Sequence, residues 1–433
     1  MKGKKRLIPF FYTAWFFWVG TAIAQSTNPS SAAPTVHTAI PGIETKVDSI
    51  MQFAIQQKAF PGAQILVLKN DTVAFHKTYG YHNYHGLKPV GPTDLYDLAS
   101  VTKILGPLPA LMKLVDEGKL ELDVPFSNYW KAWKHQNDKK DLTLREILSH
   151  QAGLTPYIVF AAETMRKNGF KTRFIKFKET KNFAKKAYKR MYVKNRFRNK
   201  MYRTINRSAV QEKKEYRYSG LAFLLFPQLI ENLTGQDYES YMKRTFYDPI
   251  QCNTLVYNPR SKALTNAIVP TEIDTIFRKN MIEGYVHDEN AALLGGVSGN
   301  AGLFGTSDDV GKMMSFFLHL GQLNGRQILS ESIVKEFIST SFSEQGNRRG
   351  LGFDKPLLGN DTLALADAYP SPKASKSSFG HAGFTGTFVW ADPEYQMVFI
   401  LLTNRVHPFR SQRGLYDLNI RIKLHDLFYS AFE

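Results

Sequence analysis

A serine and a lysine three residues apart are the side chains of this sequence best suited to chemistry. They are Ser100 and Lys103, in the stretch DLASVTK at residues 97–103. Residues three apart on a helix share one face, and an apolar run with helical spacing follows as far as Gly118. A serine hydroxyl is a weak nucleophile until a base removes its proton. A lysine in a dry pocket can be that base, or can lower the pKa of another base.

The spacing alone does not identify a site, because short motifs recur by chance. Three pairs have it: Ser100/Lys103, Ser240/Lys243 and Ser332/Lys335. A bare match is most often an ordinary pair on a helix surface. Only the first pair has apolar segments on both sides, as a buried site requires. We therefore take Ser100 and Lys103 as the candidate pair.

The N-terminus has the pattern of a secretory signal. Four basic residues within residues 2–6 precede an apolar stretch at 7–19, and Ala22-Ile23-Ala24 then provides a small-x-small cleavage site. An uncleaved membrane anchor is the alternative, but the apolar stretch is short for a span. We expect a signal peptide at 1–24, a flexible Ser/Pro/Ala-rich leader at 25–41 and one domain at 42–433. The expected location is outside the cytoplasm, in a periplasm.

The net charge of +18 is concentrated in one segment. Residues 161–214 contain 19 Lys and Arg against three Glu, a net charge of +16, and aromatic residues are interleaved with the basic ones. We interpret the segment as a solvated helical cap over the site. Contact with an anionic membrane surface or an acidic polymer is the alternative. Such interleaving could also bind nucleic acid, but an exported protein rarely meets it, so we expect no nucleic-acid partner.

Strand patterns lie at both ends of the chain and helical patterns lie between them. The runs 63–68 and 72–79 predict one hairpin, and the runs 379–390 and 397–403 predict another. Pro107 and Pro109 predict a kink or break in the helix that follows Ser100. Further helices are predicted over 43–58, 142–148, 221–233, 238–246, 307–320, 331–339 and 414–429. The predicted fold class is α/β (α+β): an antiparallel sheet flanked by helices, plus a helical lobe, with the site at the seam.

Three short motifs that could form one active site follow one another along the chain. Ser100-x-x-Lys103 comes first, Tyr218-Ser219-Gly220 follows, and His381-Ala382-Gly383 stands on a predicted strand. With these motifs, residues 59–403 resemble the serine β-lactamase/penicillin-binding-protein superfamily. The similarity is to its β-lactamase-related side: class C β-lactamases, D-alanyl peptidases, D-aminopeptidases and esterases. It extends to Ala59-Phe60-Pro61-Gly62, to SHQAGL at 149–154 and to the glycine-rich stretch 295–305.

The resemblance implies a role for each matching residue. Ser100 would be the acylated nucleophile, Lys103 its proton-transfer partner, and Tyr218 the general base with a pKa lowered by Lys103. His381-Ala382-Gly383 stands where many relatives have Lys-Thr-Gly, so that His381 matches the lysine and Gly383 the glycine. A cation or strong hydrogen-bond donor at the position of His381 would hold an anionic or polar end of the substrate. The backbone N–H groups of Ser100 and Phe384 would form the oxyanion hole.

One residue departs from the family's pattern. Relatives carry Asn or Asp as the third residue of the tyrosine motif, and here that residue is Gly220. The change removes a side-chain contact to substrate or to Lys103, and puts recognition of β-lactams and peptide amides in doubt. His381 in place of lysine, and the lack of a Glu-bearing loop of the class A kind, weaken the expectation of efficient β-lactamase activity.

These observations favour an exported serine hydrolase that acts through an acyl-enzyme. Its substrates would be esters, D-amino-acid peptides or β-lactam-like carbonyls, in small molecules or peptides that include peptidoglycan fragments. No metal or cofactor is expected. A class C-like β-lactamase is one alternative. The other is a protein with a hydrolase-like fold that binds cell-wall or membrane material without turnover, using the basic segment 161–214.

Overall fold

The computed structural model describes residues 42–433, so the signal peptide and leader predicted for residues 1–41 lie outside it. Within the described range, no helix combines the length and apolar character needed to cross a bilayer. The first element, α1 (Ile43–Gln56), confirms the first predicted helix, with Val47, Met51 and Ala54 buried on one face.

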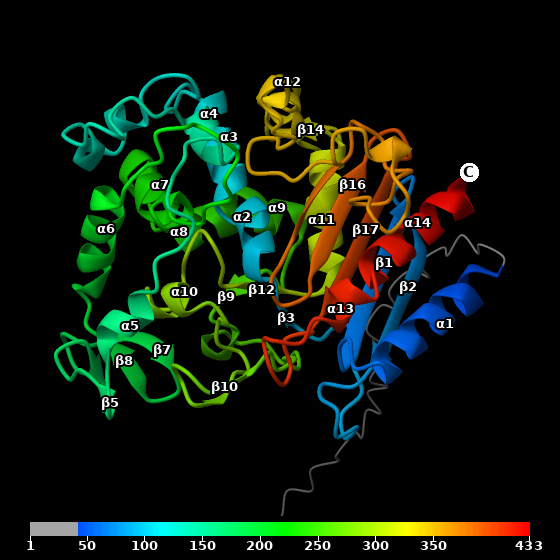
Figure 1. Cartoon of the computed structure of the whole chain (residues 1–433), viewed down its shortest axis with the longest axis horizontal. Coiled ribbons are helices and arrows are strands. Elements are labelled where there is room, and N and C mark those ends of the chain that lie inside the picture. Colours follow the sequence, from blue (N-terminus) through cyan, green and yellow to red (C-terminus); the bar gives the residue numbers. More distant parts are fainter. Residues whose placement is uncertain (1–41) are drawn as a thin grey trace, which may run out of the picture. The chain divides into compact units, whose positions relative to one another are not determined.

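One five-stranded antiparallel sheet joins the two ends of the described chain (Figure 1). Its strands follow the order β15-β16-β17-β1-β2, so the C-terminal strand β17 lies beside the N-terminal strand β1 and pairs Ala63 with Thr403. Both predicted hairpins are confirmed. The strands are β1 (Gly62–Lys69), β2 (Thr72–Gly80), β15 (Phe379–Ala382), β16 (Phe388–Asp392) and β17 (Met397–Thr403).

Helices cover both faces of this sheet, because alternate residues of its inner strands are apolar on both sides. Trp390 and Phe399 lie in the core formed with α1 and α14 (Ile420–Phe432), which Figure 1 shows together on one side. Val389 and Ile400, their neighbours in sequence, face α11 (Ser307–Leu318) and the larger core beyond it. The N-cap of α11 is Thr306, whose side-chain oxygen accepts from the N–H of Asp309.

The larger core continues from α11 into the predicted helical lobe. Its buried residues come from short helices that surround α3 in Figure 1. The helices beyond the sheet are α2 (Thr102–Leu105), α3 (Pro107–Asp116), α4 (Leu144–Leu148), α5 (Phe160–Thr164), α7 (Phe226–Thr234), α8 (Tyr238–Met242), α9 (Asp248–Ile250), α10 (Glu289–Leu293) and α12 (Glu331–Ile338), whereas α13 (Gly414–Asp417) packs with α1 and α14 through Leu415.

The helix predicted after Ser100 is broken, as the two prolines suggest. Ser100 lies in a 3₁₀ turn, Ala99–Val101, which leads into the single turn of α2. The break comes at Gly106, and Pro107 then starts α3, where its missing N–H costs no helix bond. A Cβ at Gly106 would lie 2.6 Å from the carbonyl oxygen of Thr102. Close packing therefore requires glycine at this break.

The prediction that the basic segment 161–214 is helical is wrong for most of its length. Buried side chains alternate with less buried ones over short runs here, as at Met191, Tyr192 and Val193, and this period of two favours strands. Only α6 (Phe197–Arg207) buries residues four apart, namely Phe197, Met201 and Ile205. The strands are β4 (Met165–Arg166), β5 (Gly169–Phe170), β6 (Ile175–Lys176), β7 (Lys185–Tyr188) and β8 (Met191–Val193).

Smaller sheets fix the loops around the candidate site. The most important for the site has the order β3-β12-β9, and its strand β3 runs directly into the turn that carries Ser100. The small strands are β3 (Tyr96–Asp97), β9 (Val256–Tyr257), β10 (Ile273–Asp274), β11 (Asn280–Met281), β12 (Leu303–Gly305), β13 (Gln322–Leu323) and β14 (Arg326–Gln327).

Candidate active site

The turn that carries Ser100 is held by a buried carboxylate. Asp97 ends β3, which pairs with β12, and its Oδ1 accepts from the N–H of Ala99 at 2.9 Å. Its Oδ2 accepts from the N–H of His287 at 2.6 Å. Ala99 has a φ of 47°, in the left-handed region that side chains rarely adopt. Such backbone strain is found at functional turns that the surrounding structure holds in place.

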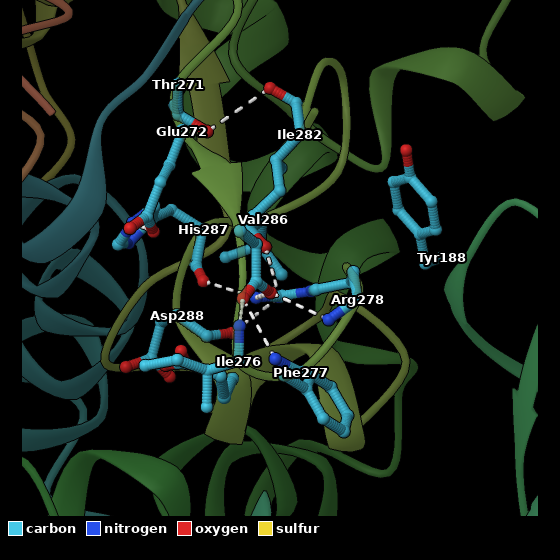
Figure 2. A network of polar contacts seen from close by, with 12 residues as sticks. Tyr188, Thr271, Glu272, Ile276, Phe277, Arg278, Ile282, Val286, His287 and Asp288 are labelled. Atoms are coloured by element: carbon cyan, nitrogen blue, oxygen red, sulfur yellow. Dashed lines mark hydrogen bonds and ion pairs between the residues drawn. The ribbon is translucent and has the colours of Figure 1, made fainter. Parts of the chain in front are cut away.

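The loop on the other side of Asp97 is fixed by a second buried network (Figure 2). The carboxylate of Asp274 accepts from the three backbone N–H groups of residues 276–278. The guanidinium of Arg278 donates to the carbonyl of His287 at 2.8 Å. Because these contacts fix the backbone around His287, its N–H stays directed at Asp97. The nucleophile turn is thus anchored to a rigid neighbour.

Lys103 connects Ser100 to the glycine-rich stretch through hydrogen bonds. Its Nζ donates to Ser100 Oγ at 2.9 Å and to the carbonyl oxygen of Asn300 at 3.2 Å. The side chain is buried, and Nζ lies 5.1 Å from the centre of the Tyr218 ring. Because Ser100 Oγ accepts from Lys103, its own proton remains available to another acceptor.

Tyr218 is placed to be that acceptor. Burial raises the pKa of its phenol. The positive charges of Lys103 and Arg349, together with hydrogen bonds from Lys103 and Ser100, lower the pKa by a larger amount, so the net pKa lies below that of an ordinary tyrosine. The residue is 36% exposed, so the ring also borders solvent. A tyrosine whose phenolate is stabilised in this way can take a proton from a serine.

Two histidines pack against the same tyrosine. The His150 ring centre lies 4.4 Å from that of Tyr218, and the His381 ring centre lies 6.2 Å away. Nδ1 of His381 lies 2.8 Å from the carbonyl oxygen of Ala382, so Nδ1 carries the proton and Nε2 is an acceptor. Burial and the charges of Arg349 and Lys103 lower the pKa of His381 to about 3. His381 is therefore a neutral imidazole, so of the two expectations for this position, a cation or a strong hydrogen-bond donor, the cation is wrong.

The residues after β15 are clamped onto the nucleophile turn. A Cβ at Gly383 would lie 2.1 Å from Thr387 Oγ1 and 2.6 Å from the carbonyl oxygen of Leu98, so only glycine fits there. The hydroxyl of Thr385 donates to the carbonyl of Asp97 at 2.8 Å. Phe384, 49% exposed, lies between them, and its N–H has no hydrogen-bond partner within residues 42–433. A free N–H next to the nucleophile turn suits the oxyanion-hole role, which stays a prediction.

A cavity of about 420 Å³ opens beside Ser100. Part of its wall is apolar, from Tyr157, Val159, Ala161, Ile276, Ala301 and Phe384. The polar part includes His287, Asn300, Asp288, Glu289 and Arg410, the last of which binds Glu289 at 2.8 Å. Ala161 is the one lining residue from the basic segment, so that segment borders the cavity with its first residue and does not cap it.

The structure thus brings together Ser100, Lys103, Tyr218 and His381, with Gly383 packed against the turn. The sequence analysis missed three residues that complete the arrangement: Asp97, Asn300 and Arg349. Asp97 and Asn300 lie within stretches that the sequence analysis had already marked: Asp97 is the first residue of the stretch 97–103, and Asn300 belongs to the glycine-rich stretch 295–305. No pattern near Arg349 indicated its place beside Tyr218.

A partly exposed serine with a buried lysine three residues on and a tyrosine beside both, between an antiparallel sheet and a helical lobe, is typical of penicillin-binding-protein-like and β-lactamase-like serine hydrolases. Residues 43–421 match the β-lactamase family model, and the chain belongs to that family. It is a serine hydrolase of the β-lactamase-related group. The predictions of family, fold class and serine hydrolase activity are confirmed.

Two relatives of assigned function align with most of the chain. The N-acetylmuramyl-L-alanine amidase of Bacillus subtilis strain 168 is 28% identical over 386 residues, which are 84% of this chain and 81% of that protein. A protein of Escherichia coli O157:H7, assigned by name to the D-alanyl-D-alanine carboxypeptidases, is 29% identical over 374 residues, 80% of this chain and 79% of its own. The structure of EstCE1, a hydrolase with promiscuous acyltransferase activity, superposes with a TM-score of 0.62 at 18% identity, covering 88% of this chain and 98% of EstCE1.

Proposed function

We propose that this protein cleaves acyl substrates through a covalent intermediate on Ser100. The observation that carries the proposal is the environment of Ser100: it lines the cavity, it accepts a hydrogen bond from Lys103, and it interacts with the Tyr218 phenol, whose pKa is lowered. Tyr218 takes the proton of Ser100 Oγ while Oγ bonds to the substrate carbonyl carbon. The same proton then passes to the leaving group as the carbonyl–leaving-group bond breaks. Water, activated in the same way, releases the acyl group and restores the serine.

We propose peptides that end in D-alanine, of the kind found in cell walls, as the substrate class. Two relatives that each cover about four fifths of the chain carry names of cell-wall enzymes, an amidase and a carboxypeptidase. The cavity is compatible with a peptide, because its apolar wall can hold a small side chain and its charged wall, Asp288, Glu289 and Arg410, can hold polar ends. Esters and β-lactams present the same reacting carbonyl and are the expected surrogate substrates.

Glycine at position 220 leaves the contacts of Lys103 and Tyr218 in place. This observation weakens the alternative of a protein that binds its ligand without turnover. Lys103 still has two acceptors, and the pKa of Tyr218 is still lowered. A class C-like β-lactamase is distinguished by kinetics: fast turnover of a chromogenic cephalosporin would support it, whereas slow release of a stoichiometric adduct would support the peptidase.

We also propose that the protein acts outside the cytoplasm, in a periplasm. The support is the pattern of basic residues, apolar stretch and small-x-small site in residues 1–24. Cell-wall peptides lie on that side of the inner membrane, so the proposed location and substrate agree. Mass spectrometry of protein purified from the native periplasm tests this location: the mature N-terminus is expected at Gln25, and an intact Met1 start would contradict it.

We further propose that the basic segment 161–214 contacts an anionic surface, such as a membrane or an acidic wall polymer. Strand β7 and the turn that follows it present exposed cations. Lys185, Lys186, Lys189 and Arg190 are all exposed, and none pairs with a carboxylate within residues 42–433. Such a surface would hold the enzyme near an anionic substrate polymer, since opposite charges attract over about 10 Å at moderate salt.

The proposed function is tested by incubating the purified protein with a pentapeptide ending in D-alanyl-D-alanine and measuring released D-alanine. Wild-type protein is expected to release it, and Ser100→Ala to lose at least about 1,000-fold in rate, as for nucleophiles of other hydrolases. Ser332→Ala, which alters the serine of another Ser-x-x-Lys match, is the control and is expected to retain full activity. Equal activity of Ser100→Ala and wild type would overturn the proposal.

A further inference from the structure

The charge environment of Tyr218 is set by four titratable groups from four parts of the chain. Lys103 comes from α2, and His150 from the loop after α4. His381 comes from β15, and Arg349 from the segment between α12 and β15. Each has its ring or charged group within 4.4 to 6.2 Å of the centre of the Tyr218 ring.

The two histidines contribute no positive charge at neutral pH. Burial and the charges of Arg349 and Lys103 hold the pKa of His150 well below its usual range. Its Nδ1 accepts from the N–H of Ser219 at 3.3 Å, a role that only a ring nitrogen without a proton can have. His381 is neutral for the same reasons of burial and neighbouring charge. Within the part of the chain described, Lys103 and Arg349 are therefore the two cations that face the tyrosine ring.

Arg349 is held rigidly in its place. It is 2% exposed, and its Cζ lies 5.6 Å from the centre of the Tyr218 ring. Nη1 lies 3.1 Å from Oδ1 of Asp354, and Nη2 donates to the carbonyl of Gly352 at 3.2 Å. A second cation, Arg348, lies 2.6 Å from the same Oδ1. The two arginines and one carboxylate carry a net charge of +1, so Asp354 holds Arg349 without cancelling the local positive charge.

We propose that Arg349 is a positioning residue for the base: its buried guanidinium stabilises the Tyr218 phenolate and, with Lys103, supplies the positive charge that the neutral His381 does not. The inference rests on the proposed function in assigning Tyr218 as the base. Arg349 acts through Tyr218, because its guanidinium faces that ring while Nη1 and Nη2 are held by Asp354 and Gly352. The phenolate must exist before it can accept the serine proton, so Arg349 sets the pH range over which the enzyme works.

The size of the effect follows from the distance. Two unit charges about 6 Å apart in a partly solvated site interact by an amount equal to about one to two pKa units. Because Tyr218 is 36% exposed, solvent screens part of this interaction, and we expect a shift of about one unit. Removing the charge of Asp354 is expected to lower the pKa of Tyr218, because its negative charge disfavours the phenolate.

The experiment titrates Tyr218 directly in the full chain. Tyrosine labelled with ¹³C at Cζ reports ionisation by NMR, and Tyr218→Phe identifies the resonance. The pKa of Tyr218 is expected to rise by about one unit in Arg349→Met, to stay near the wild-type value in Arg349→Lys, and to fall in Asp354→Asn. This readout needs no turnover, so it separates failure of the inference from failure of the proposed function.

A kinetic readout accompanies the titration. The acid limb of the pH profile for acylation by an activated ester is expected to move up by the same amount in Arg349→Met. A lower rate with an unmoved limb and an unmoved Tyr218 titration would make Arg349 merely structural and overturn the inference. If Arg349→Met fails to fold, Asp354→Asn decides: a Tyr218 pKa equal to or above that of wild type would overturn the inference.

Discussion

The ammonium group of Lys103 donates a hydrogen bond of 3.2 Å to the backbone carbonyl of Asn300, 197 residues away in the sequence. This contact bears directly on Gly220, the residue where the tyrosine motif departs from the family's pattern. A Cβ at Gly220 would have Asn300 Cβ as its neighbour, at 3.9 Å, so Asn300 lies where a larger residue 220 would point. The glycine-rich stretch thus supplies an acceptor for Lys103 from another part of the chain.

Gly220 is expected to tolerate a side chain. A Cβ would make only an ordinary contact with Asn300, so Gly220→Ala should change the free energy of unfolding by less than about 0.5 kcal/mol and leave the acylation rate of Ser100 within about twofold. Urea unfolding and labelling by an activated ester measure the two quantities. Gly383→Ala is the matched control, since its Cβ would overlap Thr387 Oγ1 at 2.1 Å and displace the loop after β15. Equal effects of both substitutions would contradict this account.

Most of the fold could be predicted because its patterns are local. Short apolar runs in residues 63–68 and 397–403 identified β1 and β17, although nothing in the sequence showed that they are neighbours. The basic segment was misread because charge and aromatic content say little about period; only burial revealed the short strands β6, β7 and β8.

The catalytic residues of the site could be predicted because they belong to short motifs. The residues that contact them from other parts of the chain could not. Ser100, Lys103, Tyr218 and His381 belong to compact motifs that the resemblance could align. Asn300 acts through its backbone carbonyl, which any residue type possesses, so its identity carries no indication of the contact with Lys103. Arg349 reaches Tyr218 through a long-range approach of two loops, and sequence spacing does not encode such an approach.

Glu272 is expected to make the protein acid-labile. Burial raises its pKa, but hydrogen bonds from His287 and Arg410 and their charges lower it to about 2, below the ordinary 4.5. Because the folded-state pKa is depressed, the stabilisation is complete above pH 4.5 and is lost as pH falls towards 2. Between pH 6 and pH 3 the wild type should lose about 2 kcal/mol from this group, measured by urea unfolding.

Glu272→Gln should lack this part of the pH dependence, because glutamine does not titrate. Glu283→Gln is the control: its partner Arg260 is 43% exposed, so solvent weakens the pair and the pH dependence should match that of wild type. An unchanged slope in Glu272→Gln would show that the network around Glu272 does not govern acid stability.

Binding of the basic segment to anionic vesicles is expected to depend on its exposed cations. Changing Lys185, Lys186, Lys189 and Arg190 to glutamine should weaken binding at least tenfold, since each basic residue near such a surface contributes about 1 kcal/mol. Vesicle sedimentation at low and at about 1 M salt measures it, and high salt should abolish wild-type binding. The control removes the same charge elsewhere, from the exposed Lys58, Lys88, Lys134 and Lys423. Equal loss in both variants would point to net charge alone and contradict a specific surface.

The central claim, that Ser100 is an acylated nucleophile, is tested most directly by intact mass spectrometry after incubation with a penicillin. Wild-type protein is expected to gain one penicillin mass per chain, and Ser100→Ala to gain none. The lifetime of the adduct then separates a penicillin-binding peptidase from a β-lactamase. An adduct that persists in Ser100→Ala, or no adduct in wild type with either a penicillin or an activated ester, would contradict catalysis at Ser100.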